Sequence, residues 1–431
     1  DEIDAGLIQE MLAIPSFGIP FRDAVGDSER AADKVDRTLR KRGLADSITA
    51  VDVIRGGFFR NRGVYLVGRI RLHGGSVVPL ILALLHDEAG IYIDAVLADE
   101  PEAHNLFSTT RANFIVTNDH YHELAEFLYG IMPKRPLGLH YSSLGFNHFG
   151  KVAVMDELTA ELTEDDAVLD TAVGFPGTVA IGFQAPGSVY NLKVIRDHPT
   201  DNYKWGDFAG VESVLEKYRR VHDINRTGSM LDNAIYYNVT LPKSHFAMEL
   251  LSEMLEDASN AVSLRGTTVF FQHLIVQRKM IPMPVFLEQA PREDCERAVI
   301  SLGQCIKNNM AANIFNRDLD GRNYGVGSHI RVYLFDYDAL ETFTDVKIRS
   351  NQGRFDGEED IPGWFFEDGV VFLPEEIESG LRIVDRDLRR LFRSVHGDLL
   401  KVEYWQRIQD ELRGGNVPQI QVYPESSCLG A

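Results

Sequence analysis

Apolar residues cluster in three neighbouring stretches within the first third of the chain. The stretches are 63–72, 77–85 and 91–97, and a His-Gly-Gly-Ser turn separates the first two. Short apolar runs bounded by glycine-containing turns are typical of strands in an antiparallel sheet. The pattern therefore predicts a strand meander here, and a similar run predicts a further strand at 112–117.

Helical spacing flanks this meander on both sides. Residues 1–60 have the pattern of helices, with Ser28 as an expected N-cap and Gly43 as an expected stop signal. After the last strand, Asn118 or Asp119 is expected to cap another helix. Helices beside a meander predict an α+β domain.

The remainder of the chain changes from strand patterns to helical ones at a proline-containing segment. Strand patterns at 178–195 and 269–276 precede the segment 278–284, whose prolines indicate a stiff connector rather than a helix. Helical spacing over 295–310 follows it. A strongly acidic stretch at 155–170 suggests an earlier boundary. The predicted domains are residues 1–158, residues 159–288 and residues 289–431.

Charge and composition exclude several classes of protein. The net charge is −20, and the lysines and arginines are scattered among more numerous acids, which disfavours nucleic-acid binding. The longest apolar run, at 77–85, is far shorter than the ~20 residues of a membrane span. Cys295, Cys305 and Cys428 form no closely spaced pair of the kind found in metal sites. We therefore expect a cytoplasmic protein without a secretion leader, a membrane partner or a nucleic-acid partner.

The strongest candidate chemistry lies between residues 313 and 338. Asp318 is followed by Asn323 and then, after two short strand patterns that predict a hairpin, by Asp336. Protein kinases use three such groups: an Asp that positions the substrate hydroxyl, and an Asn and a second Asp that hold Mg²⁺. Mg²⁺ prefers oxygen ligands, which an Asn and an Asp supply. The spacing therefore predicts a phosphoryl-transfer site.

Two other interpretations of this segment compete with a kinase site. A calcium loop that begins at Asp318 would need a Glu at its twelfth position, where His329 stands. A solvated acidic turn without function would explain Asp318 and Asn323, but it would not explain the hairpin that leads to Asp336. The kinase interpretation is therefore preferred.

Upstream residues supply what a kinase needs on the other side of its nucleotide. A glycine turn ahead of a strand can approach phosphate oxygens closely, because glycine has no Cβ. Lys193 can reach the same phosphates from the strand face opposite to Leu192 and Val194. Glu212 or Glu216 on the next helix could pair with this lysine, or could be surface charge. The candidate turn comprises Gly174, Phe175, Pro176, Gly177, Thr178 and Val179.

The combined motifs resemble those of the bacterial isocitrate dehydrogenase kinase/phosphatase family. The resemblance covers essentially the whole chain and includes LKVIRD at 192–197, HLIVQRKMIP at 273–282, NYGV at 323–326 and FDYD at 335–338. It implies an α+β fold class, with an N-terminal α+β regulatory domain followed by a bilobal protein-kinase-like domain. It also implies an ATP-dependent serine kinase that phosphorylates isocitrate dehydrogenase, and removes the phosphate again, to control entry into the glyoxylate bypass.

The same resemblance implies a role for each site residue. Lys193 would contact the phosphates of ATP, and Asp318 would be the catalytic carboxylate. Asn323 and Asp336 would hold Mg²⁺, and Asp338 would serve the phosphatase reaction. AMP is implied as an allosteric effector, and a homodimer is left open.

Several positions depart from the family pattern. Ala339 stands where the family usually has a Glu after the Asp-Tyr-Asp motif, and Gln277, which we assign to nucleotide binding, replaces a hinge Glu. His148 and Phe149 occupy the place of an expected basic pair. The chain also begins well inside the regulatory domain of the family. Two alternatives therefore stay open: a kinase of the same fold that has lost phosphatase activity or changed its substrate, and a pseudokinase-like binding module.

Overall fold

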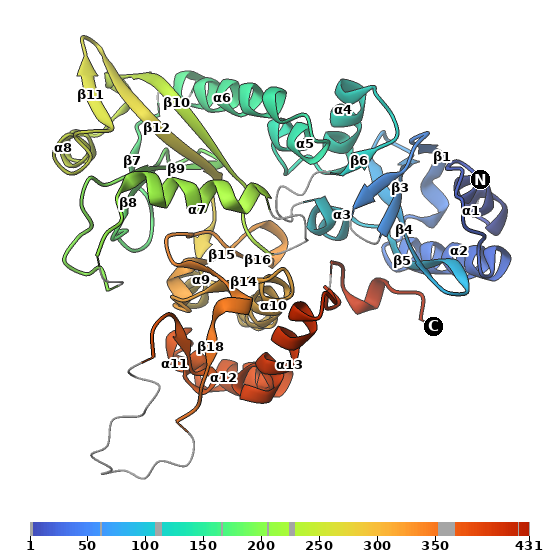
Figure 1. Cartoon of the computed structure of the whole chain (residues 1–431). Coiled ribbons are helices and arrows are strands. Elements are labelled where there is room, and N and C mark those ends of the chain that lie inside the picture. The colour runs from blue at the N-terminus through green and yellow to red at the C-terminus, as the bar shows by residue number, and fades with distance from the viewer. Residues whose placement is uncertain are drawn as a thin grey trace. The chain divides into compact units, whose positions relative to one another are not determined.

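The computed structural model describes residues 3–60, 63–107, 114–164, 167–204, 207–223, 229–351, 367–420 and 422–430 (Figure 1). The chain forms two compact units. Unit 1 comprises Asp1–Glu157 and Val422–Ala431, and unit 2 comprises Leu158–Gln421. Within the ranges described, no helix has the length and apolar character needed to cross a membrane.

Unit 1 is built on one sheet. Its strand order is β5-β4-β3-β2-β6, and β1 also pairs with β3. The predicted meander is confirmed, because β3, β4 and β5 pair in sequence order as antiparallel neighbours. The strands are β1 (Ile48–Val53), β2 (Phe58–Arg60), β3 (Gly63–Leu72), β4 (Val77–Asp87), β5 (Gly90–Leu97) and β6 (Ile115–Val116). The helices are α1 (Ala5–Leu12), α2 (Ala24–Lys41), α3 (Glu100–Phe107), α4 (Tyr121–Ile131), α5 (Leu137–Ser143) and α6 (Asn147–Glu164), the last of which continues into unit 2.

Both faces of this sheet are buried. In β4, Leu80 and Leu82 belong to the apolar cluster that includes α1 and α2, whereas Ile81 and Ala83 belong to the cluster that includes α3 and α4. Figure 1 shows α2 and α3 on opposite sides of the strands. Successive residues of a strand point to opposite faces, so helices on both sides require apolar residues at every position. This explains why the run in β4 is continuous.

The C-terminal segment 422–430 completes unit 1. The backbone N–H of Leu429 donates to the carbonyl of Asp94 in β5 at 2.9 Å. The hydroxyl of Ser427 donates to the carboxylate of Glu102, a residue 325 positions earlier in the chain. Burial raises the pKa of Glu102, although the Ser427 hydrogen bond opposes this effect. The segment is therefore a structural part of unit 1.

Three local predictions for unit 1 were wrong. Residues 1–60 are not helical throughout, because β1 and β2 occupy the end of that range. Helix α2 begins before Ser28, since the carboxylate of Asp23 accepts a hydrogen bond from the N–H of Gly26 and caps the helix there. The N-cap of helix α4 is His120 rather than Asn118 or Asp119, and its side chain makes no capping hydrogen bond; Asn118 accepts from the N–H of His120, ahead of the helix. The stop at Gly43 is confirmed by a left-handed φ of 67° directly after the C-cap.

Two further stretches of unit 1 differ from the expected boundaries. Of the predicted strand 112–117, β6 contains only Ile115–Val116, and residues 112 and 113 lie outside the described residues. The acidic stretch 155–170 does not break the chain at its start, because α6 continues to Glu164. An acidic stretch can be either a linker or the solvated side of a helix, and the amino-acid composition is the same in both cases.

The first half of unit 2 is an antiparallel sheet with two helices. Its strand order is β10-β12-β9-β8-β7, and β11 pairs with β12. The strands are β7 (Asp170–Thr171), β8 (Ala180–Gln184), β9 (Tyr190–Ile195), β10 (Asn233–Pro242), β11 (Val262–Arg265) and β12 (Thr268–Arg278). The helices are α7 (Val211–Asp223), which connects β9 to β10, and α8 (Met248–Asp257). The register places Lys193 of β9 opposite Ile275 of β12 and opposite Gly182 of β8.

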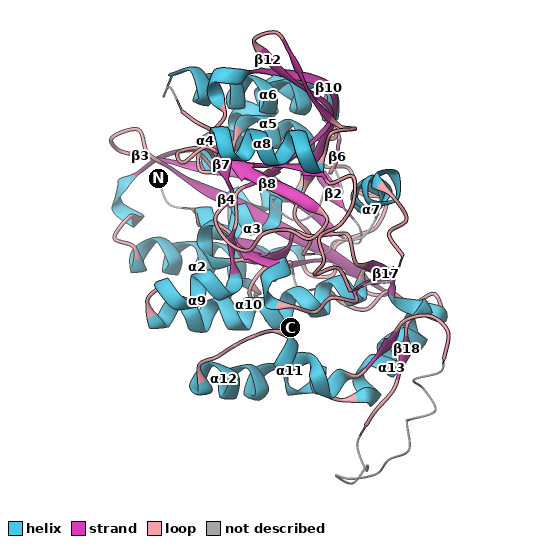
Figure 2. Ribbon diagram, turned by 90° about the vertical axis from the view of Figure 1, so that its left-hand side faces the viewer, coloured by secondary structure: helices cyan, strands magenta, loops and turns pink. Residues whose placement is uncertain are grey.

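The second half of unit 2 is mostly helical and is arranged around α10 (Figure 2). Its helices are α9 (Met283–Gln289), α10 (Arg292–Ala311), α11 (Ile377–Gly380), α12 (Arg386–His396) and α13 (Val402–Arg413). Its short strands are β13 (Ile281–Pro282), β14 (Ile314–Asn316), β15 (Tyr324–Val326), β16 (Val332–Leu334), β17 (Leu340–Thr342), β18 (Lys347–Ile348) and β19 (Val371–Phe372). The connector predicted at 278–284 is shorter than expected, because α9 already begins at Met283 and accepts Pro284 in its first turn.

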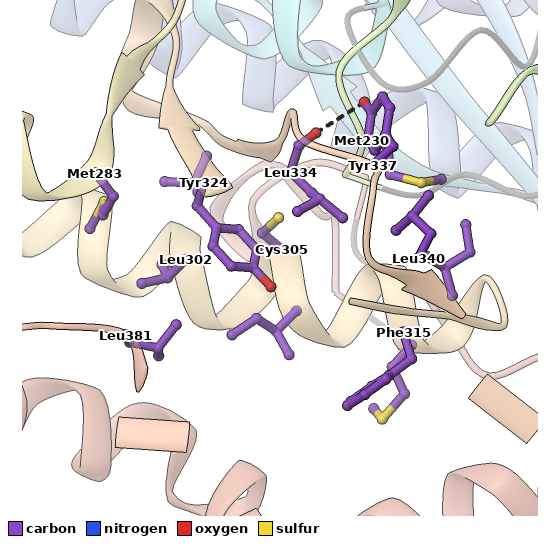
Figure 3. Packing of buried hydrophobic residues seen from close by; sticks show 14 of the residues in the cluster. Met230, Met283, Leu302, Cys305, Phe315, Tyr324, Leu334, Tyr337, Leu340 and Leu381 are labelled. Atoms are coloured by element: carbon purple, nitrogen blue, oxygen red, sulfur yellow. Dashed lines mark hydrogen bonds between the residues drawn. The ribbon is translucent and has the colours of Figure 1, made fainter. Parts of the chain in front are cut away.

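An apolar core lies beneath the predicted hairpin. Strands β15 and β16 pair as expected, and Tyr324 and Leu334 pack with Leu302 and Cys305 of the helix α10 (Figure 3). Tyr337, which follows the hairpin, donates a hydrogen bond from its hydroxyl to the carbonyl of Leu334 at 3.1 Å. This buried anchor fixes the backbone on either side of Tyr337.

Candidate active site

A cleft in unit 2 collects most of the predicted site residues. It is lined by the loop between β7 and β8, by the ends of β9 and β12, by the loop that precedes β15 and by the segment after β16. The predicted residues that line it are Phe175, Pro176, Gly177, Thr178, Lys193, Gln277, Asp318, Asn323, Asp336 and Asp338. Segments that are distant in sequence thus meet at one site.

Lys193 is buried at the back of this cleft. Its Nζ donates to the carbonyl of Phe335 at 3.0 Å and to the hydroxyl of Tyr218 at 3.2 Å. Burial lowers the pKa of Lys193, and the carboxylates of Asp336 and Asp338 oppose this effect. Lys193 thus places one cationic group beside two carboxylates in the cleft lining, and this ammonium group can interact with a bound anion.

Asp318 and Asn323 form a hydrogen-bonded pair. The Nδ2 group of Asn323 donates to Oδ2 of Asp318 at 3.0 Å and to its carbonyl oxygen at 2.9 Å. The N–H of Asp318 in turn donates to the side-chain oxygen of Asn316 at 3.1 Å. Burial raises the pKa of Asp318, and the hydrogen bond from Asn323 opposes this effect. One carboxylate oxygen of Asp318 is therefore held, and the orientation of the other is fixed with it.

Asp320 anchors the loop that carries this pair. Its carboxylate accepts hydrogen bonds from Arg322 at 2.8 Å and from Arg382 at 2.8 Å. Burial raises the pKa of Asp320, but the hydrogen bonds from the two arginines outweigh it and keep the pKa below its usual range. Gly321 also packs tightly, because a Cβ at this position would lie 2.3 Å from the carbonyl oxygen of Leu381. Asp320 thus stabilises the loop rather than the cleft surface.

Asp336 and Asp338 flank the buried Tyr337. The two carboxylates line the cleft, and the tyrosine side chain points into the core. Burial and the neighbouring carboxylate of Asp336 raise the pKa of Asp338 to about 7, against the opposing effect of Lys193. The Nζ of Lys217 donates to the backbone carbonyl of Asp338. Asp338 therefore changes its ionisation near neutral pH.

Only some residues of the predicted glycine turn line the cleft. Phe175 is half exposed, and its ring lies 5.5 Å from the guanidinium of Arg322 across the cleft. Gly177 cannot be replaced without strain, because a Cβ would lie 2.3 Å from the carbonyl oxygen of Ala180. Gly174 has φ 128° and faces Pro282. The side chain of Val179 lies in the apolar core, so neither Gly174 nor Val179 forms part of the cleft lining.

Two amide side chains also line the cleft. Gln277 and Asn191 are directly opposite each other in the pairing of β12 and β9. The Nε2 group of Gln277 donates to the carbonyl of Phe335 at 3.3 Å. Within the described part of the chain, the buried side-chain oxygens of Gln277 and Asn191 have no hydrogen-bond partner. A buried acceptor without a partner is costly, so both oxygens are suited to receive hydrogen bonds from a ligand.

A second cavity lies on the other side of Asp338. Its lining includes Lys217 of α7, Arg317, Ala339 and Glu341. Arg317 and Glu341 form an ion pair at 3.6 Å. The cavity is thus lined by both cations and carboxylates, and the side chain of residue 339 is part of its wall.

The partner of Lys193 differs from both carboxylates that the sequence suggested. Neither Glu212 nor Glu216 reaches it, because both form ion pairs with Arg219 on the exposed side of α7. The partner is Tyr218, a buried residue of the same helix. A tyrosine at this helical position has the same spacing whether it only packs in the core or also binds Lys193, so the spacing could not indicate the hydrogen bond.

Comparisons with known proteins agree with this geometry. The family model described as "Isocitrate dehydrogenase kinase/phosphatase (AceK) kinase domain" matches residues 167–425, and the model described as the regulatory domain of the same family matches residues 3–166. These matches confirm the predicted resemblance and the predicted combination of a regulatory and a kinase-like domain.

Individual relatives extend the similarity along the chain. An isocitrate dehydrogenase kinase/phosphatase of Rhodopseudomonas palustris (strain HaA2) is 50% identical over 433 residues, covering 99% of this chain and 70% of the relative. One from Anaeromyxobacter sp. (strain Fw109-5) is 32% identical over 425 residues, covering 98% of this chain and 73% of the relative. A solved structure, the ROP18 kinase domain in complex with AMP-PNP and sucrose, matches 61% of this chain and 93% of its own. Its TM-score is 0.30 at 10% identity, a similarity too low to bear on fold or ligand.

Proposed function

Because this chain belongs to the isocitrate dehydrogenase kinase/phosphatase family, we propose that unit 2 transfers a phosphoryl group from ATP to a serine of isocitrate dehydrogenase. The same cleft would also remove that phosphate. One observation carries the proposal: Lys193, Asp318, Asn323 and Asp336 come from separate segments and line a single cleft. Regulation by AMP, a cytoplasmic location and dimerisation stay predictions.

The cleft has the polar groups that a nucleotide requires. Lys193 supplies a buried cation for phosphate oxygens, and Phe175, Gly177 and Thr178 of the turn have backbone N–H groups in the cleft lining. Gln277 and Asn191 offer buried side-chain oxygens that lack partners among the described residues. These oxygens suit an adenine amino group, which is a hydrogen-bond donor. The residues therefore fit ATP.

Oxygen ligands for a divalent cation lie beside the proposed phosphate site. Asp336 contributes a carboxylate, and Asn323 contributes an amide oxygen, since its Nδ2 group is already engaged by Asp318. Hard oxygen ligands of this kind favour Mg²⁺. When bound, Mg²⁺ would offset the negative charge of the phosphates, and ATP would supply the phosphoryl group.

We assign Asp318 the role of orienting the substrate hydroxyl and accepting its proton. Asn323 holds Oδ2 of this carboxylate, which orients Oδ1 for a serine hydroxyl. The serine oxygen forms the new bond to phosphorus, the bond to the ADP oxygen breaks, and the serine proton passes to Asp318. The raised pKa of Asp318 favours this proton acceptance.

We assign Asp338 to the hydrolysis of phosphoserine, in which water rather than ADP accepts the phosphoryl group. Hydrolysis of phosphoserine requires an oriented water molecule and a group that accepts its proton. A carboxyl group with a pKa of about 7 is ionised in part of the molecules at neutral pH and can accept that proton. Ala339 offers no second carboxylate next to it, so we expect the phosphatase activity to be weak relative to the kinase activity.

The test is phosphoryl transfer with purified isocitrate dehydrogenase, Mg²⁺ and ATP labelled on its γ-phosphate. We expect label to appear on a serine of isocitrate dehydrogenase with the wild-type protein. Lys193→Met should abolish this transfer, whereas the matched control Lys401→Met, at an exposed position outside the cleft lining, should not. If the wild-type protein transfers no label, and ATP with Mg²⁺ does not raise its melting temperature, the proposal is wrong.

A further inference from the structure

Tyr218 connects the two charged groups that define the cleft. It lies on α7 with 1% of its surface exposed. Its hydroxyl accepts a hydrogen bond from Nζ of Lys193 at 3.2 Å and donates one to Oδ1 of Asp336 at 3.2 Å. One hydroxyl group can do both at once. The three side chains therefore form a continuous hydrogen-bonded chain.

This hydroxyl takes the place that a carboxylate on the corresponding helix has in other kinases, where a Glu pairs with the strand lysine. Glu212 and Glu216 of α7 do not take that place, because their side chains are 76% and 66% exposed and pair with Arg219. The lysine is instead held by a neutral group.

The charges already present explain why a neutral group suits this position. Asp336 and Asp338 both lie close enough to Lys193 to affect its pKa. A third buried carboxylate would repel these two and would also pay a desolvation penalty. Burial keeps the pKa of Tyr218 well above its usual value, so the hydroxyl stays protonated. It can hold Lys193 without cancelling the positive charge that a phosphate needs.

The position of the hydroxyl is fixed from two sides. The ring of Tyr218 packs edge-on against Tyr337, with 5.0 Å between ring centroids. The backbone carbonyl of Tyr218 accepts a hydrogen bond from the side chain of Asn233 at 3.2 Å. Because Tyr337 separates Asp336 from Asp338 in sequence, the helix α7 and the metal-binding segment are held by the same aromatic contact. A donor that is held in place in this way orients Asp336 before any ligand binds.

We propose that Tyr218 is a positioning residue that couples Lys193 to Asp336, so that the phosphate-binding cation and the metal-binding carboxylate keep their relative geometry. The inference rests on the proposed function, since it assigns Asp336 to Mg²⁺. Tyr218 itself is not one of the residues that line the cleft. Its effect passes through the other two residues.

The test is Tyr218→Phe, which removes only the hydroxyl and leaves the ring against Tyr337. The control is Tyr333→Phe, because Tyr333 is equally buried and its hydroxyl has no hydrogen-bond partner within the described ranges. For each protein, binding of ATP is measured by calorimetry as a function of Mg²⁺ concentration, alongside the melting temperature. We expect Tyr218→Phe to raise the half-saturating Mg²⁺ concentration about tenfold, the size of effect that loss of one hydrogen bond to a charged group produces. The control should not change it.

The outcomes separate the two proposals. If the wild-type protein does not bind ATP with Mg²⁺, the proposed function fails, and this inference fails with it. If the wild-type protein binds and Tyr218→Phe behaves like Tyr333→Phe, only the role of Tyr218 is overturned. A double-mutant cycle with Asp336→Asn provides the second check. In the Asp336→Asn background, Tyr218→Phe should weaken ATP binding less than it does in the wild-type protein, because only its hydrogen bond with Lys193 is then lost. An undiminished effect would overturn the coupling of Tyr218 to Asp336.

Discussion

The raised pKa of Asp338 makes a prediction about stability that needs no ligand. An ordinary aspartate has a pKa of 3.8, whereas that of Asp338 is about 7. Between these values the unfolded chain loses the proton and the folded chain keeps it, so ionisation favours the unfolded state as the pH rises. The favourable contribution of the protonated group is therefore complete below pH 3.8 and is lost as the pH approaches 7. The substitution Asp338→Asn introduces a neutral amide, which resembles the protonated acid at every pH.

The size of the effect follows from this difference. Each pKa unit corresponds to about 1.4 kcal/mol, and two units separate pH 5 from the folded-state pKa of about 7. Asp338→Asn should therefore increase the free energy of unfolding by about 3 kcal/mol more at pH 8 than at pH 5. Urea unfolding without Mg²⁺ or nucleotide measures this difference. Tryptophan fluorescence reports on unit 2, because all 3 tryptophans of the chain lie within residues 158–421.

The same loop system offers a matched control. The pKa of Asp320 is lowered in the folded protein, since hydrogen bonds from Arg322 and Arg382 outweigh its burial. The stability that Asp320 contributes is lost only as the pH falls below 3.8. Asp320→Asn should therefore destabilise unit 2 equally at pH 5 and pH 8. If Asp338→Asn also had the same effect at both pH values, the carboxyl group would be ionised throughout, and the reasoning would be refuted.

Three further predictions concern activity. Asp318→Ala should slow phosphorylation of isocitrate dehydrogenase by roughly 10² or more, the scale of general-base contributions, while calorimetry should show ATP affinity near that of the wild type; equal losses would assign Asp318 to the metal instead. Ala339→Glu should increase phosphate release from phosphorylated isocitrate dehydrogenase, because the new carboxylate would enter the cavity lined by Lys217 and Arg317, and an unchanged rate would contradict this. Gln277→Leu should weaken ATP binding about five- to tenfold through loss of a hydrogen-bond acceptor, and GTP, which lacks the adenine amino group, should show no comparable loss.

Local patterns predicted the parts of the site that local structure determines. Asp318 and Asn323 lie in one short loop, and a tight hairpin leads from Asn323 to Asp336, so spacing along the chain was enough to bring them together. Lys193 was also assigned correctly to a buried strand position, because a lysine between Leu192 and Val194 faces away from both. Residues joined by a short loop or a tight hairpin are close in space, so their proximity can be predicted from the sequence.

Contacts between distant elements could not be predicted in the same way. Whether Glu216 or Tyr218 reaches Lys193 depends on the rotation of α7 about its axis, which is set by packing against Tyr337, more than 100 residues later. The partnerless oxygens of Gln277 and Asn191 likewise became visible only through the pairing of β12 with β9. A tyrosine at a core position of a helix has the same pattern whether its hydroxyl is used or not.

The assembly of unit 1 from both ends of the chain has a consequence for biosynthesis. The carboxylate of Glu102 leaves the ribosome 325 residues before its partner Ser427. At ordinary elongation rates this interval is on the order of tens of seconds. During that time the β5 edge and the buried acid beside it lack the segment that covers them, while the whole of unit 2 is being translated. Unit 1 is therefore completed only after unit 2 has been translated, because its segment 422–430 follows unit 2 in the chain.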